Sequence, residues 1–125
     1  MQKHLSNYEI GKIGEDAVSL YLERTNHIVL ERNYRNRLGE IDIIFVDGNT
    51  LVFGEVKTRT SNKFGEPKEA VDRRKINKIL AVAKVYISNK RIVNVDIRFD
   101  VFEVMYHQRK IKHIKDAYMG GVFHW

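Results

Sequence analysis

Apolar residues near the start of the chain recur every three or four positions, which is the spacing of an amphipathic helix. Ser6 and Asn7 are both suitable N-cap residues, and the pattern continues to about Asn26, so we expect a helix over this range. The face expected to be buried carries Ile10, Ile13, Gly14, Ala17, Leu20 and Tyr21, and the opposite face carries Lys12, Asp16, Ser19 and Glu23.

The spacing then changes to the two-residue period of β-strands. Residues 27–36 are β-prone, residues 40–47 alternate, and residues 50–59 form a third run after the turn signal Asp47-Gly48. Short turns between consecutive strands predict an antiparallel meander. In the second strand we expect one face to carry Ile41, Ile43 and Phe45 and the other to carry Asp42, Ile44 and Val46.

Helical spacing returns in the second half of the chain. Residues 60–67 read as a loop, and a helix is predicted from near Pro67 to about Asn89. A strand over 92–106 follows, with a short strand near 110–115 and an apolar tail over 118–125 that we expect to dock. The order α-β-β-β-α-β predicts an α/β fold, a mixed β-sheet flanked by helices, with a parallel crossover around the second helix.

Composition limits the classes of protein that this chain can belong to. A chain of 125 residues with 43% apolar residues is long enough to bury one core. The absence of cysteine excludes disulfides, thiolate nucleophiles and cysteine-ligated zinc, and the five histidines show no metal-ligand spacing. No apolar run approaches the roughly 20 residues that span a bilayer. No signal-peptide core follows Met1, so a cytoplasmic protein without membrane contact is the simplest interpretation.

The positive charge is concentrated in one segment. The chain has a net charge of +6, but residues 57–91 carry eleven Lys or Arg against three Asp or Glu. Such a segment is typical of a surface that binds a polyanion, and a solvated lysine-rich helix face is the alternative. The side chains that we expect to contact nucleic acid are Arg59, Lys63, Arg73, Arg74, Lys75 and Lys78. Phe64 could stack on an unpaired base, and packing in the core is the alternative for this residue.

Two acidic residues on neighbouring strands suggest chemistry beside this basic segment. If the strands over 40–47 and 50–59 pair, Asp42 and Glu55 can converge at one end of the sheet. Two carboxylates repel unless a cation or proton intervenes, and Mg²⁺ or Mn²⁺ would be held by Asp42, Glu55 and the Val56 carbonyl. Lys57 could orient water or contact a phosphate, and Glu15 could add a carboxylate from the first helix. A salt-bridged sheet edge, with Glu15 as an ordinary surface residue, is the alternative for this cluster.

Several short motifs together resemble a known family. They are Gly11-x-x-Gly14-Glu15-Asp16-Ala17, Arg32-Asn33-Tyr34-Arg35, Gly39-Glu40-Ile41-Asp42-Ile43-Ile44, Glu55-Val56-Lys57-x-Arg59, Phe64-Gly65 and Arg98-Phe99-Asp100-Val101. On these motifs, which run from about residue 8 to 104, the chain resembles the bacterial YraN family within the PD-(D/E)xK restriction-endonuclease-like superfamily. Ile41 stands where the superfamily name has proline.

The resemblance implies a fold and a set of roles. It implies one restriction-endonuclease-like domain over residues 1–125, with a three-layer core. Asp42 and Glu55 would be metal ligands, Lys57 the catalytic lysine, and Glu15 the helix carboxylate of resolvase-like relatives. Since those relatives work as dimers, a homodimer is expected on the same ground.

These observations lead to one main expectation and two alternatives. We expect a Mg²⁺-dependent endonuclease that hydrolyses DNA, resolvase-like on branched structures. The alternatives are a nucleic-acid-binding module of nuclease ancestry that does not cut, and a protein-interaction domain. On the strand over 92–106, Arg98 lies between Asp96 and Asp100, which predicts an ion-pair ladder there. The sequence leaves open DNA versus RNA, the preferred metal and the biological pathway.

Overall fold

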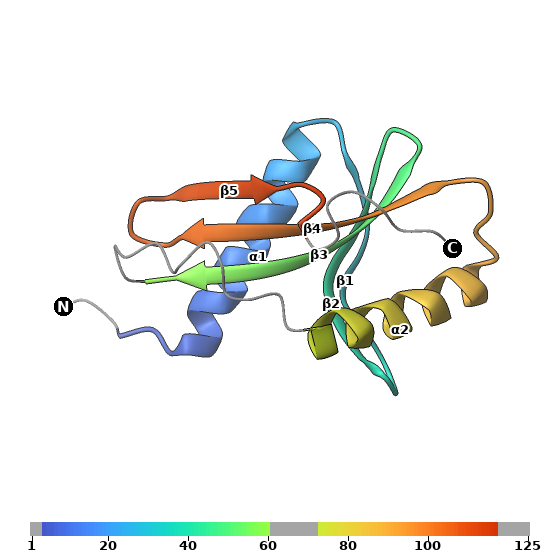
Figure 1. Ribbon diagram of the computed structural model, residues 1–125. Coiled ribbons are helices and arrows are strands. Elements are labelled where there is room, and N and C mark those ends of the chain that lie inside the picture. The colour runs from blue at the N-terminus through green and yellow to red at the C-terminus, as the bar shows by residue number, and fades with distance from the viewer. Residues whose placement is uncertain (1–3, 61–72, 118–125) are drawn as a thin grey trace.

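Figure 1 shows the computed structural model, which describes residues 4–60 and 73–117, with two helices and a five-stranded sheet in this part. The predicted α/β fold is confirmed, and the short fifth strand is present. In chain order the elements are α1 (Asn7–Arg24), β1 (Ile28–Asn36), β2 (Gly39–Asp47), β3 (Thr50–Arg59), α2 (Arg73–Lys90), β4 (Asp96–Met105) and β5 (Lys110–Ile114).

The sheet is mixed, and its strands lie side by side in chain order. Antiparallel pairing joins β1 to β2 and β2 to β3, which confirms the predicted meander. The β3 and β4 strands are parallel, as expected when a helix connects them, and β5 returns antiparallel to β4. The carboxyl ends of β3 and β4 therefore lie at the same edge of the sheet.

Two hydrophobic clusters, one on each face of the sheet, give the three layers. On one face, Val18 and Leu22 of α1 pack in a cluster with Phe102. On the other, Val82 of α2 packs in a cluster with Phe53. In Figure 1, α1 passes behind β3, β4 and β5, whereas α2 lies beside the β1–β2 hairpin. The predicted three-layer core is thus what the packing produces.

The α1 helix begins where the sequence predicted. The Ser6 hydroxyl accepts a hydrogen bond from the Glu9 N–H at 3.1 Å, and the Glu9 carboxylate accepts one from the Ser6 N–H at 3.1 Å. This reciprocal capping box satisfies two backbone donors that the first helical turn would otherwise leave unpaired.

The buried face of α1 differs from the predicted one. Ile13 and Leu20 are exposed at 42% and 47%, although both were expected to be buried. The helix is rotated because Gly14 comes so close to β3 that a Cβ atom there would lie 1.8 Å from the Thr58 hydroxyl oxygen. The buried positions are Gly14, Val18, Ser19 and Leu22.

Alternation in β2 breaks at Asp42. Ile43 and Phe45 both pack in the cluster on the α1 side. Ile41 packs in the cluster on the α2 side, together with Ile44. A strict two-residue period would have placed Ile41 with Ile43. The prediction that these three residues share a face is therefore wrong at Ile41, which lies just beyond the point where the pairing of β2 with β3 stops.

The fourth strand is shorter than predicted. It begins at Asp96 rather than near residue 92, because Asn94 adopts a left-handed conformation with φ of 61°, and Val93 is exposed. The predictions for Phe64 and for the tail over 118–125 lie outside the described residues. In the described part of the chain, no helix combines the length and apolar character needed to cross a bilayer.

Candidate active site

The site is built where β2 and β3 separate. Their pairing runs from Asp47 opposite Thr50 to Ile43 opposite Gly54, and the next residues along are Asp42 and Glu55. There the Asp42 Oδ2 atom accepts a hydrogen bond from the Val56 N–H at 2.8 Å. A carboxylate side chain thus contacts a backbone donor of β3, and the two acidic residues converge on the same part of the sheet.

Asp42 is held in an environment that disfavours its charge. Burial is the largest influence on this group, and it raises the pKa of Asp42 to about 6. The hydrogen bond from Val56 lowers the pKa, whereas the negative charges of Glu15, Glu55 and Glu40 raise it further. The fold therefore brings four carboxyl groups close enough to repel one another, and the resulting negative potential favours the binding of a cation.

Glu55 is paired with a lysine from the helix on the same face. Its carboxylate Oε1 atom forms an ion pair with the Lys75 ammonium of α2. The Glu55 side chain is 19% exposed and the Lys75 side chain 47% exposed, so the lysine reaches inward from the rim. Lys75 is one of the residues predicted to contact nucleic acid, and in this structure its ammonium contacts an acidic residue of the site.

A pocket of about 300 Å³ lies between the end of the β2–β3 pairing and α2. Its polar lining includes Asp42, Glu55, Lys75 and Lys78, and apolar residues such as Phe53 line the rest. A volume at the lower end of the range for small-molecule sites is large enough for a metal ion with its waters or for part of a nucleotide. The predicted carboxylate pair therefore opens onto a cavity.

Glu15 approaches the site from the opposite face of the sheet. Gly14 lets α1 come against Thr58 of β3, and the adjacent Glu15 then lies close enough to raise the pKa of Asp42 by charge repulsion. Glu15 does not line the 300 Å³ pocket. Its contribution in this structure is electrostatic, and the glycine before it is the reason that the helix can bring it there.

Lys57 and Arg59 follow Glu55 on β3, in the part of the strand that pairs with β4. The parallel register places Lys57 opposite Glu103 and Arg59 opposite Met105. Glu103 is a buried carboxylate that was not predicted from the sequence, because nothing in the apolar strand around it indicates that a lysine lies beside it. Lys57 is half-buried and, like Glu15, does not line the pocket.

The other predicted contacts to nucleic acid fall into two groups. Arg74 and Lys78 are exposed on α2, and Lys78 also lines the pocket. Arg73 begins α2 but only its backbone is described, and Lys63 lies outside the described residues. The helix thus brings part of the basic segment to the mouth of the acidic site.

The donor set suits a hard divalent cation in its chemistry. Asp42 and Glu55 supply carboxylate oxygens, the ligands that Mg²⁺ and Mn²⁺ prefer. Because the N–H and C=O of one strand residue point to the same side, the Val56 carbonyl points to the same edge of β3 as its N–H, toward Asp42. Within residues 4–60 and 73–117, no three His, Cys, Asp or Glu side chains are grouped closely enough to hold a metal ion, so water would have to complete the coordination.

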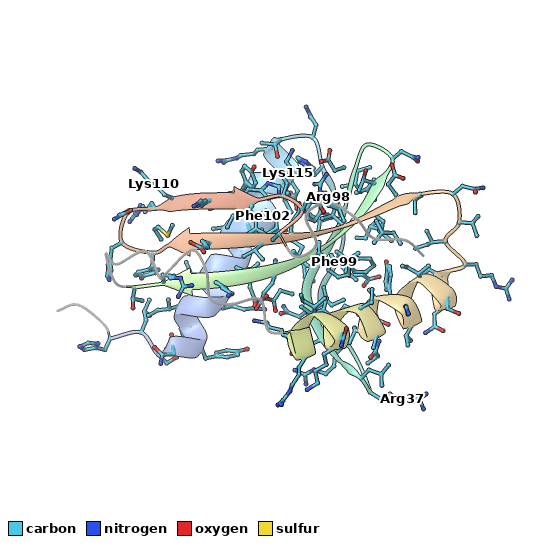
Figure 2. The ribbon with its side chains drawn as sticks, viewed as in Figure 1. Arg37, Arg98, Phe99, Phe102, Lys110 and Lys115 are labelled. Atoms are coloured by element: carbon cyan, nitrogen blue, oxygen red, sulfur yellow. The ribbon has the colours of Figure 1, made fainter. Side chains whose placement is uncertain are left out.

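A second polar cluster surrounds the fully buried Asp100 on β4. Figure 2 labels its neighbour Arg98 on the same strand. The Asp100 carboxylate accepts hydrogen bonds from Arg98 Nε at 2.8 Å and Nη2 at 2.9 Å, from the Asp116 N–H at 3.0 Å, and lies 2.7 Å from His113 Nε2. Arg98 also binds Asp47 at 3.0 Å.

Burial by itself would raise the pKa of Asp100, but the hydrogen bonds from His113, Arg98 and Asp116 lower it below its ordinary value. The predicted ladder is therefore confirmed for Arg98 and Asp100. Asp96 is exposed, and the second carboxylate that binds Arg98 comes from Asp47.

The comparisons with known proteins agree on one family. The model of the uncharacterised protein family UPF0102 matches residues 14–104. A UPF0102 protein of Clostridium beijerinckii is 43% identical over 116 residues, which cover 90% of this chain and 94% of the relative. One of Dictyoglomus thermophilum is 48% identical over 81% of this chain and 86% of its own length. A UPF0102 protein of Clostridium botulinum is 46% identical over 92% of this chain and 98% of its own length. The resemblance to the YraN family is thereby confirmed, and the chain belongs to the uncharacterised protein family UPF0102.

Proposed function

We propose that this protein is a metal-dependent endonuclease that hydrolyses phosphodiester bonds in DNA. The observation that carries the proposal is Asp42, a half-buried carboxyl group with a pKa raised to about 6, beside Glu55 in a pocket that basic residues border. Folding that brings acidic groups together in a cavity is costly, and a site that binds a cation during function explains why the cost is tolerated.

Asp42, Glu55 and the Val56 carbonyl are the residues that would hold Mg²⁺ or Mn²⁺. When bound, such an ion supplies a Lewis acid and lowers the pKa of a coordinated water. Asp42 must lose its proton to act as a ligand, so binding strengthens as the pH rises through about 6. Lys57 would hold the attacking water or a phosphate oxygen in place, and Glu15 would add to the negative potential that attracts the cation.

DNA is the substrate that the surrounding charge favours. Arg74 and Lys78 on α2, together with Arg59 on β3, would contact phosphates and release counterions on binding. The half-buried Lys57 would then lie near the scissile phosphate, at the boundary between the acidic site and this basic surface. A resolvase-like enzyme must cut two strands, and on that ground we propose that the active form is a homodimer.

A second candidate is a nucleic-acid-binding module that no longer cuts. The observation that favours it is the ion pair between Lys75 and Glu55, which places an ammonium group on one of the two expected ligands. The lack of a three-carboxylate group among the described residues points the same way. Such a protein would bind DNA with a strong dependence on salt and would leave it intact.

One cleavage experiment separates these functions. The purified protein is incubated with labelled four-way junction, flap, single-stranded and duplex DNA in Mg²⁺, Mn²⁺ or EDTA. Asp42→Ala and Lys57→Ala variants are compared with Asp96→Ala, an exposed carboxylate on β4 outside the site. We expect metal-dependent cleavage that falls by at least about 100-fold in the first two variants only.

The possible results differ clearly. Binding without cleavage in every metal, unchanged by Asp42→Ala or Lys57→Ala, would favour the binding module. Cleavage that survives both substitutions would show that the reaction occurs elsewhere on the molecule. Absence of both binding and cleavage would reject DNA as the ligand and favour a protein-interaction domain.

A further inference from the structure

We propose that Lys75 is an internal cation that competes with the divalent metal for Glu55, and that metal binding transfers the Lys75 ammonium from Glu55 to a phosphate of the nucleic acid. This inference rests on the proposed function and adds a coupling between its two ligands. It assigns to one helix residue a different partner in each state of the site.

The position of the ion pair supports a competition. Lys75 and Glu55 line the same pocket as Asp42, and the lysine contacts the carboxylate that a metal would need. Glu55 is the more buried partner, and Lys75 is about half exposed at the pocket rim. An ammonium on a flexible side chain can leave toward solvent without any movement of the helix or the strand.

The charges favour the metal over the lysine. Lys75 brings one positive charge and pairs with Glu55, whereas the same pocket holds the two carboxyl groups of Asp42 and Glu55. Glu40 is already paired with Arg35 at 3.0 Å. A divalent ion brings twice the charge of Lys75 and can bind Asp42 and Glu55 together, whereas half-exposed ion pairs contribute little stability.

Displacement gives Lys75 a second use. Lys75 and Lys78 are three residues apart on α2 and therefore lie on one face of the helix, and both line the pocket. Once released from Glu55, Lys75 would stand beside Lys78 at the pocket mouth, where a phosphate bound to the site would come. Metal and nucleic acid would then each strengthen the binding of the other, as thermodynamic linkage requires.

The first test measures metal binding without any nucleic acid. Mn²⁺ affinity is determined by calorimetry at pH 7.5 for the full chain and for Lys75→Gln, Lys78→Gln and Glu55→Gln. We expect Lys75→Gln to bind Mn²⁺ roughly 5-fold more tightly, because the competing ammonium is gone. Lys78→Gln removes the same charge from the same helix face but no ion pair with Glu55, so we expect a change of no more than about twofold. Glu55→Gln should weaken binding.

The second test measures the coupling. Affinity for a labelled duplex is compared in Ca²⁺ and in EDTA at one fixed salt concentration. In the unchanged protein we expect tighter binding in Ca²⁺, and in Lys75→Gln we expect that ratio to shrink by at least about threefold. Lys78→Gln should weaken binding in both conditions and keep the ratio, because its phosphate contact does not depend on the metal.

The outcomes separate this inference from the proposed function. If Mn²⁺ binds equally well to the unchanged protein and Lys75→Gln, while Glu55→Gln binds more weakly, the metal site stands and the competition is rejected. If no variant binds Mn²⁺, the metal site itself fails and the competition with it. If only Lys75→Gln binds, the competition is supported in its strongest form. Circular dichroism of each variant confirms that the fold is intact.

Discussion

Asp42 and Asp100 are two aspartates in one sheet, the first half-buried and the second fully buried, and their pKa values shift in opposite directions. Asp100 is fully buried, and Arg98, His113 and the Asp116 N–H bind both of its oxygens, so its pKa is lowered despite burial. Asp42 has a single described hydrogen bond, from Val56, and three acidic neighbours, so its pKa is raised to about 6.

The difference separates a structural charge from a candidate functional one. Donors from β4, from β5 and from the residues after β5 surround Asp100, so its negative charge joins those segments. The carboxylate of Asp42 gains much less from the folded protein by itself, and a ligand would supply the missing compensation. Burial alone does not explain the difference, since the more buried Asp100 is the one with the lowered pKa; the number and sign of the neighbouring groups explain it.

The largest expected effect comes from removing the structural charge. We expect Asp100→Ala to destabilise the protein by about 3–5 kcal/mol, because it removes the buried carboxylate that Arg98 and His113 share and leaves Arg98 with Asp47 alone. The measurement is urea unfolding at pH 7.5. Asp96→Ala is the matched control on the same strand, and since Asp96 is exposed it should change stability by no more than about 0.5 kcal/mol. Equal unfolding midpoints for the two variants would remove the distinction between Asp42 and Asp100.

The next effect should have the opposite sign. A raised folded-state pKa means that ionised Asp42 destabilises the fold, fully above about pH 6 and not at all below about pH 4. Asp42→Asn keeps an acceptor for the Val56 N–H and removes the charge. We therefore expect it to stabilise the protein by about 2–3 kcal/mol at pH 7.5, with a difference that closes toward pH 4.

The control for this pH dependence is another aspartate on the same strand. Burial is the largest single influence on Asp47 and raises its pKa, but the hydrogen bond and charge of Arg98, together with the charges of His27 and Lys115, lower the pKa overall. Asp47→Asn should therefore destabilise the protein at pH 7.5, and that loss should disappear as the pH falls below the ordinary aspartate pKa. If Asp42→Asn and Asp47→Asn shift stability in the same direction, the contrast between a carboxylate with a raised pKa and one with a lowered pKa is wrong.

The smallest effect tests how α1 brings Glu15 to the site. Gly14→Ala would place a methyl group 1.8 Å from the Thr58 hydroxyl oxygen, so we expect a loss of about 1–3 kcal/mol as the helix moves away from β3. The same movement should lower the pKa of Asp42, which NMR titration can follow. Thr58→Ala in the same chain should restore most of the stability. Gly11→Ala has open space around it and should instead stabilise the helix by about 0.5–1 kcal/mol.

The sequence predicted the elements well wherever their pattern was local. The Ser6 cap, the three-strand meander and the helix that ends near Asn89 depend on neighbouring residues, and each is present. The buried face of α1 was wrong, because which of two overlapping apolar stripes is buried depends on Gly14 fitting against β3, a contact between distant residues. The start of β4 was also wrong, since apolar alternation cannot show that Asn94 leaves the strand.

The candidate site also has features that the sequence predicted and features that depend on contacts between distant residues. The sequence by itself determined which acidic and basic side chains are available, and strand periodicity placed Glu55 and Lys57 on one face. Only the tertiary structure decided that Asp42 contacts Val56, that Glu15 lies near it, and that Lys75 pairs with Glu55. Helix–sheet packing and the separation of β2 from β3 set these distances, and the electrostatic consequences, a raised pKa in one place and a lowered pKa in another, depend on the distances rather than on the residue types.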